Sequence, residues 1–228
     1  MDKIKTRFVG KELERGRDRP IRILSIGCGL AGDLFVLNLL WGKKYCFELT
    51  GLDIDSEKIH LLNYFKEKRE VKNLAFLLGD AQVLPFKEGA FDIVICSEVL
   101  EHLPDPEKAI SEIRRVLVSD GLAIITTPNG SNLLTLVGRL FKRIPKGREV
   151  NEEKSEHISV KAWREWVRLF KKAGFSVERV LRGSLIIGGP AYDHFSALFG
   201  IILIIESILD LIPLGRDFAE QFTLVARK

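Results

Sequence analysis

Residues 23–33 read ILSIGCGLAGD, a short apolar run followed at once by Gly27, Gly29 and Gly32. The run predicts a buried strand, and the glycines after it have the spacing G-x-G-x-x-G. Such a turn lets a backbone approach a nucleotide closely, because glycine tolerates positive φ and has no side chain to stand in the way. Taken alone, the motif is equally compatible with a plain strand-to-helix turn.

The alternation that begins here continues to about residue 128. Strands that are apolar throughout alternate with helices, which predicts a parallel sheet covered on both faces. The expected strands are 21–26, 47–55, 74–80, 91–97 and 122–128. The expected helices are 33–41, 56–70 with Ser56 as its cap, and 105–118, and an Asp120-Gly121 turn precedes the fifth strand.

Polar groups gather where these strands end. Gly27, Asp53, Asp80 and Ser97 each lie at the carboxyl end of a strand, which is where open parallel sheets bind their ligands. A carboxylate at Asp53 can accept hydrogen bonds from both hydroxyls of a ribose, or simply favour the start of the next helix. NAD and S-adenosylmethionine both contain that ribose, so Asp53 does not distinguish between them. Asp80 is placed to accept from an adenine amine.

The composition limits the other classes of protein. A chain of 228 residues suffices for one α/β domain. The net charge of +4 gives no case for nucleic acid. The three cysteines, Cys28, Cys46 and Cys96, form no CxxC pair, which argues against a disulfide framework or a zinc site. The charged first 20 residues are no signal peptide, so we expect a cytoplasmic protein.

The later part of the chain departs from the alternation. An amphipathic helix at 159–173 ends at Gly174, and strands are expected at 175–181 and 221–227. The segment between those two strands is too long for a hairpin loop. We expect one domain, 1–228, with lid or substrate insertions at about 130–156 and 184–216.

Six segments occur in an order and spacing typical of one family: GCG, GLDID, GDAQVLPF, SEVLEHL, RRVLVSDG and TPN. Over residues 21–129, and again over 157–175, the chain resembles class I S-adenosylmethionine-dependent methyltransferases. It is most similar to their small-molecule, quinone-biosynthesis-like branch, the type 11 methyltransferase domain. The resemblance implies an α/β fold, a Rossmann-like doubly wound sheet of seven strands. It also implies the strand order 3-2-1-4-5-7-6, an antiparallel strand 7 and helical lid insertions.

The resemblance also implies which residues bind S-adenosylmethionine. Gly27, Cys28 and Gly29 would line its methionine part, Asp53 the ribose, Ile54 the adenine face, Asp80 and Ala81 the adenine edge, and Ser97 the sulfonium. Many relatives have an acid two residues before the first glycine, where this chain has Ser25. The chain therefore lacks a negative charge that would face the ammonium end of the cofactor.

Candidates for chemistry lie in SEVLEHL. Glu98, Glu101 and His102 are spaced i, i+3 and i+4, on one face of a helical turn. By resemblance they are candidate ligands of Mg²⁺, which would lower the pKa of a phenol. The alternative is that the two glutamates cap and solvate the helix. His102 is a candidate general base, and His157 is a candidate substrate contact.

Two apolar segments suggest the kind of acceptor. Residues 131–144 form a basic amphipathic pattern. Residues 195–214 are long enough for a membrane span, but Glu206 and Asp210, four residues apart, indicate an amphipathic helix instead. Both segments are compatible with a lid over the active site. They are also compatible with an apolar entrance that contacts a membrane peripherally.

The sequence thus predicts an S-adenosylmethionine-dependent methyltransferase acting on a small, apolar or lipid-like acceptor, with O-methylation favoured. Two alternatives stay open: a non-catalytic S-adenosylmethionine-binding partner subunit, and an NAD-dependent oxidoreductase. The second is disfavoured by Asp80 and by the antiparallel terminal strand. TPN at 127–129 is not the signature of amino-group methylation.

Overall fold

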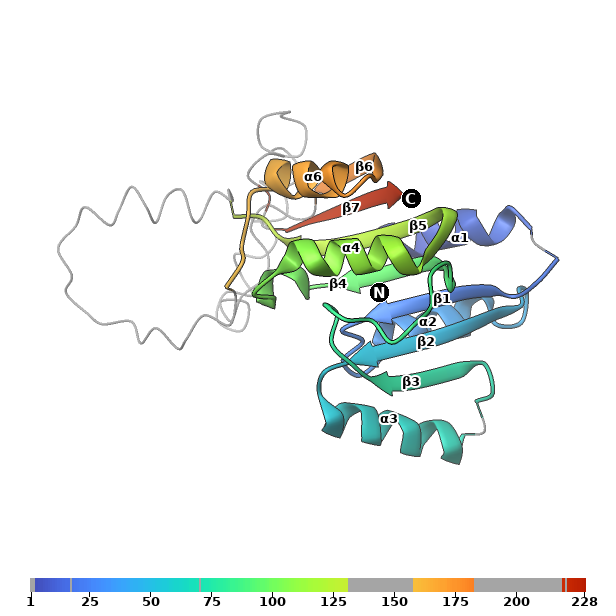
Figure 1. Ribbon diagram of the computed structural model, residues 1–228. Helices are drawn as coiled ribbons and strands as arrows, with labels where there is room; N and C mark the ends of the chain where they lie inside the picture. Colours follow the sequence, from blue (N-terminus) through green and yellow to red (C-terminus); the bar gives the residue numbers. More distant parts are fainter. Residues whose placement is uncertain (1–2, 17, 70, 131–157, 183–218, 220) are drawn as a thin grey trace, which may run out of the picture.

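The computed structural model describes residues 3–16, 18–69, 71–130, 158–182, 219 and 221–228. Within them, one seven-stranded sheet has the order β3-β2-β1-β4-β5-β7-β6 (Figure 1). Its strands are β1 Ile21–Ile26, β2 Phe47–Asp53, β3 Leu74–Leu78, β4 Phe91–Ser97, β5 Leu117–Pro128, β6 Ser176–Arg182 and β7 Gln221–Arg227. The strands β1 to β5 are parallel, and β7 is antiparallel to both of its neighbours. The predicted fold class and strand order are confirmed.

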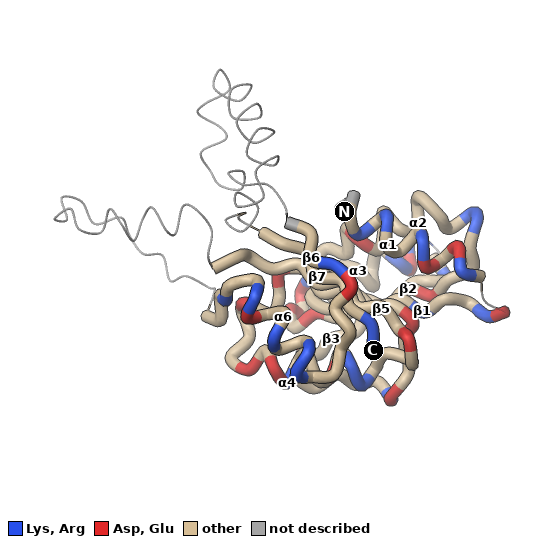
Figure 2. The backbone as a smooth tube through the Cα atoms, turned by 90° about the horizontal axis from the view of Figure 1, so that it is seen from above, with Lys and Arg blue, Asp and Glu red and all other residues tan. Residues whose placement is uncertain are grey.

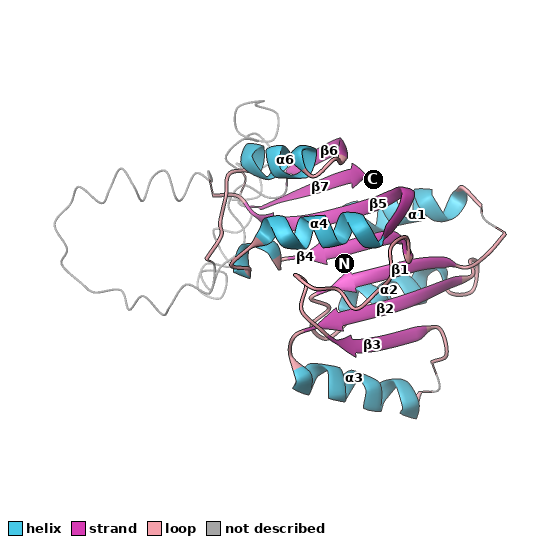
Figure 3. Cartoon of the chain, in the orientation of Figure 1, coloured by secondary structure: helices cyan, strands magenta, loops and turns pink. Residues whose placement is uncertain are grey.

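Helices cover both faces of the sheet (Figure 3). On one face an apolar cluster joins strand residues to α1 (Lys3–Glu14), α2 (Gly32–Trp41) and α3 (Ser56–Lys68). On the other face a second cluster joins the sheet to α4 (Pro106–Val116) and α6 (Trp163–Lys172). The sheet is therefore buried on both sides, which explains why its central strands are apolar at nearly every position. Basic and acidic residues are mixed along α1, α3, α4 and α6 (Figure 2).

Several predicted boundaries are wrong. Helix α1 was not expected. Asp55, not Ser56, caps α3, since its side chain accepts hydrogen bonds from the N–H groups of Glu57 and Lys58. Helix α6 begins at Trp163 rather than at 159.

The expected turn at Asp120 lies inside β5. Leu117 already pairs with Phe91, whereas Leu122 pairs with Ile93, so β5 contains extra residues relative to β4. Asp120 accommodates this bulge with a φ of 60°. Leu117 and Val118, expected at the end of a helix, therefore begin the strand.

Three predictions concern segments outside the described residues. These are the helix at 131–144, the stretch 195–214 and, apart from Gly130, the two insertions. Among the described residues, no helix has the length and apolar character needed to cross a membrane.

Candidate functional site

The turn between β1 and α2 forms the centre of the candidate site. Gly27 and Gly29 adopt positive φ, 61° and 52°, as the motif predicted. The third residue with positive φ is Ala31, at 57°, whereas Gly32 begins α2. The positions with positive φ in this turn are therefore 27, 29 and 31, with an alanine at the last of them.

The first two glycines have different surroundings. A Cβ on Gly27 would overlap the side chain of Val99, so this glycine is needed for packing. A Cβ on Gly29 would meet no atom within 4 Å. The space beside Gly29 is open, as a cradle for a ligand requires.

Asp53 joins this turn to the end of β2. One carboxylate oxygen accepts the N–H of Gly29 at 2.7 Å, and the other accepts the N–H of Asp55 at 3.0 Å. Each oxygen has two lone pairs, so both can still accept from hydroxyl groups of a ligand. The residue is only 8% exposed, and the two backbone N–H groups hold its carboxylate in place. The glycine turn and the acid at the end of β2 are thus joined by a direct hydrogen bond.

Cys28 packs beneath the turn rather than acting as a nucleophile. Its Sγ lies 2.9 Å from the position of a Cβ built on Gly51 in β2. Burial, and then the charge of Asp53, raise the pKa of the Cys28 thiol to about 12. The thiol is therefore protonated at neutral pH. Ile54, the residue after Asp53, is 75% exposed, which leaves an apolar surface free for a ring.

The loop after β3 presents Asp80. Its Oδ1 accepts the N–H of Gln82 at 2.8 Å, an interaction that fixes the loop locally. Ala81 is 7% exposed and packs into the core beneath the loop. The predicted adenine-edge pair therefore has one half-buried carboxylate and one residue whose side chain is directed to the core.

Ser97, at the end of β4, belongs to a polar cluster that the sequence did not predict. Its Oγ donates to Asp33 Oδ2 at 3.3 Å and accepts from Lys5 Nζ at 2.8 Å. Lys5 also donates to Asp33 at 3.0 Å. Asp33 and Ser97 lie 28 and 92 positions from Lys5 in the sequence, so no local pattern connects the three residues. Their partnership follows from the placement of α1.

Glu98 and Glu101 follow directly. Glu98 has a φ of 53°, uncommon for a residue with a side chain and typical of strained functional segments. Glu101 is fully buried, and its Oε2 accepts from the Thr127 hydroxyl at 3.1 Å. Its Oε1 has no hydrogen-bond partner in the described part of the chain. Burial first, and then the charge of Glu98, raise the pKa of Glu101 to about 7.

The remaining predictions concern the candidate metal ligands and the two candidate histidines. His102 ends the 3₁₀ turn Leu100–His102, half-buried, and its backbone N–H donates to Val99. Within the described ranges, no three or more His, Cys, Asp or Glu side chains come together as metal ligands. Glu98, Glu101 and His102 therefore do not form a ligand set there. His157 lies outside the described residues.

Comparisons with known proteins point to one family. Residues 18–174 match the family model described as "Methyltransferase domain". Ajmaline N-methyltransferase of Rauvolfia serpentina is 32% identical over 47% of this chain and 36% of its own length. Demethylmenaquinone methyltransferase of Lactococcus lactis is 28% identical over 77% of this chain and 73% of its own.

The fold is also found in solved structures. Phosphoethanolamine N-methyltransferase 2 of Haemonchus contortus, in complex with S-adenosyl-L-methionine, has a TM-score of 0.64. It is 16% identical, and the match covers 99% of this chain and 52% of that one. The chain spans less than half the length of the first curated relatives that it matches.

Proposed function

Since the chain belongs to the methyltransferase domain family, we propose that it transfers the methyl group of S-adenosylmethionine to a small-molecule acceptor. The observation that carries the proposal is the hydrogen bond from the Gly29 N–H to Asp53, beside the open space over Gly29. A backbone turn with room for a ligand is thereby attached to a carboxylate that suits a ribose.

The residues of the site divide the work of binding. Gly29 leaves space for the methionine part, and Asp53 accepts from the ribose hydroxyls. The exposed side chain of Ile54 offers a surface to the adenine ring, and Asp80 accepts from its amine. When bound, S-adenosylmethionine supplies a methyl group already activated on a sulfonium, so holding the acceptor in line accounts for much of the rate.

An oxygen nucleophile has, in addition, to lose its proton. We propose that Glu101 accepts it, with His102 as the second candidate. A proton acceptor works best when its pKa lies near the working pH, and burial brings the pKa of Glu101 to about 7. O-methylation, which the sequence favours, is the reaction that we propose. The relatives named above include an N-methyltransferase, so amines belong in the same acceptor screen.

Calorimetric titration tests the cofactor proposal. Gly29→Ala and Gly89→Ala both place a side chain at a positive φ, 52° and 64°, with open space around it. We expect both to lose about 1 kcal/mol of stability. Only Gly29→Ala should weaken binding of S-adenosylhomocysteine, by about tenfold or more, or about 1.4 kcal/mol. Binding of NAD instead, or equal binding by both variants, would contradict the proposal.

Turnover tests the catalytic part. Release of S-adenosylhomocysteine with a phenolic acceptor supports an enzyme, whereas cofactor binding without turnover on any acceptor supports the partner-subunit alternative. Loss of activity with EDTA, restored by Mg²⁺, would show that the reaction uses the ion. An unchanged rate would leave proton removal to a side chain, Glu101 or His102.

We further propose an apolar acceptor and a cytoplasmic location with peripheral membrane contact. The apolar sequences of 131–144 and 195–214 support the apolar acceptor and the membrane contact. The free thiols of Cys28, Cys46 and Cys96 suit a reducing compartment such as the cytoplasm. Sedimentation with anionic vesicles at low salt should carry the protein into the pellet. Protein that stays in the supernatant would exclude the membrane contact.

A further inference from the structure

Lys5 is a buried lysine at the edge of the candidate site. The residue is 8% exposed, and its ammonium donates to Asp33 at 3.0 Å and to Ser97 at 2.8 Å. Lysines are almost never buried to this degree unless they are paired. The three side chains come from three separate elements, α1, α2 and β4, so tertiary packing, and not a local turn, brings them together.

The cluster lies where the proposed cofactor would have its amino-acid end. Asp33 is in the first turn of α2, directly after the glycine turn, and Ser97 ends the neighbouring strand β4. A carboxylate and an ammonium thus stand side by side at this end of the site. This arrangement of opposite charges is complementary to a zwitterion, the form in which an α-amino acid exists at neutral pH.

We propose that Lys5 and Asp33 together bind the amino-acid end of the cofactor, Asp33 taking its ammonium and Lys5 its carboxylate. Asp33 then supplies the negative charge that position 25 does not. Ser25 is 5% exposed and uncharged, and it lies in β1 between Gly51 and Ile95 of the adjacent strands. The inference rests on the proposed function, because it assigns a role toward the same cofactor.

Contacts other than those of Lys5 also hold α1 in place. Val9 and Leu13 are buried in the core, and a Cβ on Gly10 would lie 2.9 Å from the ring of Trp41. Farther along the helix, Glu12 pairs with Arg227 at 2.9 Å. Variants at position 5 should therefore fold, and their ligand affinities can be compared directly.

The test measures dissociation constants by calorimetry for S-adenosylhomocysteine and for 5′-methylthioadenosine, which lacks the amino-acid end. The variants are Lys5→Met and Asp33→Asn, and the control is Lys11→Met on the exposed side of the same helix. We expect Lys5→Met and Asp33→Asn to weaken S-adenosylhomocysteine binding by about tenfold or more. Methylthioadenosine should bind all four proteins within about twofold, and Lys11→Met should match the wild type for both ligands.

Other outcomes separate the two proposals. Equal losses for both ligands would mean that Lys5 only supports the fold of the site. Tighter S-adenosylhomocysteine binding by Lys5→Met would mean that Lys5 occupies the place of the ligand's ammonium. Either result overturns the zwitterion site while leaving the proposed function intact. Failure of the wild type to bind either ligand would instead overturn the proposed function.

Discussion

Because Glu101 is buried, ionisation of its carboxyl group lowers the stability of the fold. Its pKa is about 7 in the folded protein, whereas an unfolded glutamate titrates near about 4.3. Between these values the native state holds a proton that the unfolded state has lost. The free energy of unfolding therefore falls as the pH rises from about 4 to about 7.

Glu101→Gln should remove this dependence, because an amide does not titrate. From pH 5 to pH 8 the wild type should lose about 2 kcal/mol of unfolding free energy through this group, and the variant should not. The difference between variant and wild type, measured by urea unfolding at both pH values, should therefore shift by about 2 kcal/mol in favour of the variant. Glu112→Gln is the control, since the neighbouring Arg115 lowers the pKa of Glu112 and leaves it ionised at both pH values. A pH-independent difference between Glu101→Gln and the wild type would show that Glu101 ionises normally.

At this scale the sequence predicted residue types better than partners. Asp53 and Asp80 were proposed because each was expected at the end of a strand, and strand ends can be recognised locally; Asp53 does end β2, whereas β3 ends at Leu78, two residues before Asp80. Asp33 was not, since its importance depends on Lys5, which lies 28 positions away on a helix that the sequence did not indicate. The burial of Glu101 likewise depends on its contact with Thr127 of β5, which no spacing reveals.

At the scale of elements, Gly27 in the β1–α2 turn lies close against Val99, the residue before the 3₁₀ turn Leu100–His102. Gly27→Ala would force a side chain into positive φ, at about 1 kcal/mol, and against Val99, at about 1–3 kcal/mol more. We expect a total loss of about 2–4 kcal/mol of unfolding free energy, from urea or thermal unfolding.

The pair Gly27→Ala/Val99→Ala isolates the contact. The double variant should recover the steric part of the loss and keep the backbone part, so the two changes should not be additive. Gly89→Ala, at a similar φ of +64° with nothing nearby, shows the backbone part alone. Strict additivity would mean that the turn moves away from Val99 at little cost.

Element boundaries were missed where a tertiary contact decides them. The segment at 117–121 looks like a helix end followed by a turn, yet pairing of Leu117 with Phe91 draws it into β5. Helix α1 has Phe8, Val9 and Leu13 as its only apolar side chains beyond its first turn, too few for a clear pattern among many charges. Its stability comes from the core that it packs against.

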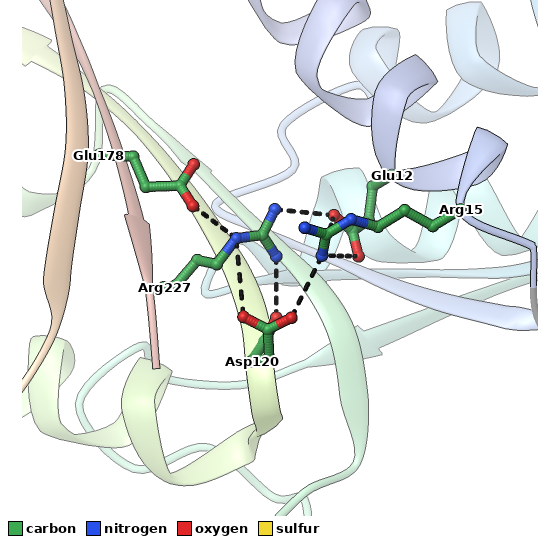
Figure 4. A network of polar contacts seen from close by, with 5 residues as sticks. All are labelled: Glu12, Arg15, Asp120, Glu178 and Arg227. Carbon is green, nitrogen blue, oxygen red and sulfur yellow. Dashed lines mark hydrogen bonds and ion pairs between the residues drawn. The ribbon is translucent and has the colours of Figure 1, made fainter.

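At the scale of the whole molecule, alternation of strands and helices predicted a parallel sheet covered on both faces, whereas the order of its strands was given by the resemblance. The antiparallel place of β7 was not derivable in this way; it came from the resemblance alone. Strand β7 inserts between β5 and β6 and brings the C-terminal residues over the start of the chain. Figure 4 shows the result, a polar network that joins α1 to three strands.

Arg227 is the centre of this network. Its guanidinium donates to Glu12 at 2.9 Å, to Glu178 at 2.6 Å and to the carbonyl of Asp120 at 2.9 Å. The Glu12 side chain is only 1% exposed, so loss of Arg227 takes a close cationic partner from a buried carboxylate, which keeps its contact with Arg15 (Figure 4). We expect Arg227→Met to lower the unfolding free energy by about 2–4 kcal/mol in urea.

The matched control is Lys172→Met, which breaks the ion pair with Glu107, where the side chains are 72% and 52% exposed. That change should cost less than about 1 kcal/mol. A double variant, Glu12→Gln/Arg227→Met, should recover part of the loss, because the buried charge is removed along with its partner. If Arg227→Met costs no more than Lys172→Met, then the contacts of Arg227 contribute little to holding α1 against the sheet. In that case the placement of Lys5 at the candidate site would owe nothing to the C-terminal strand.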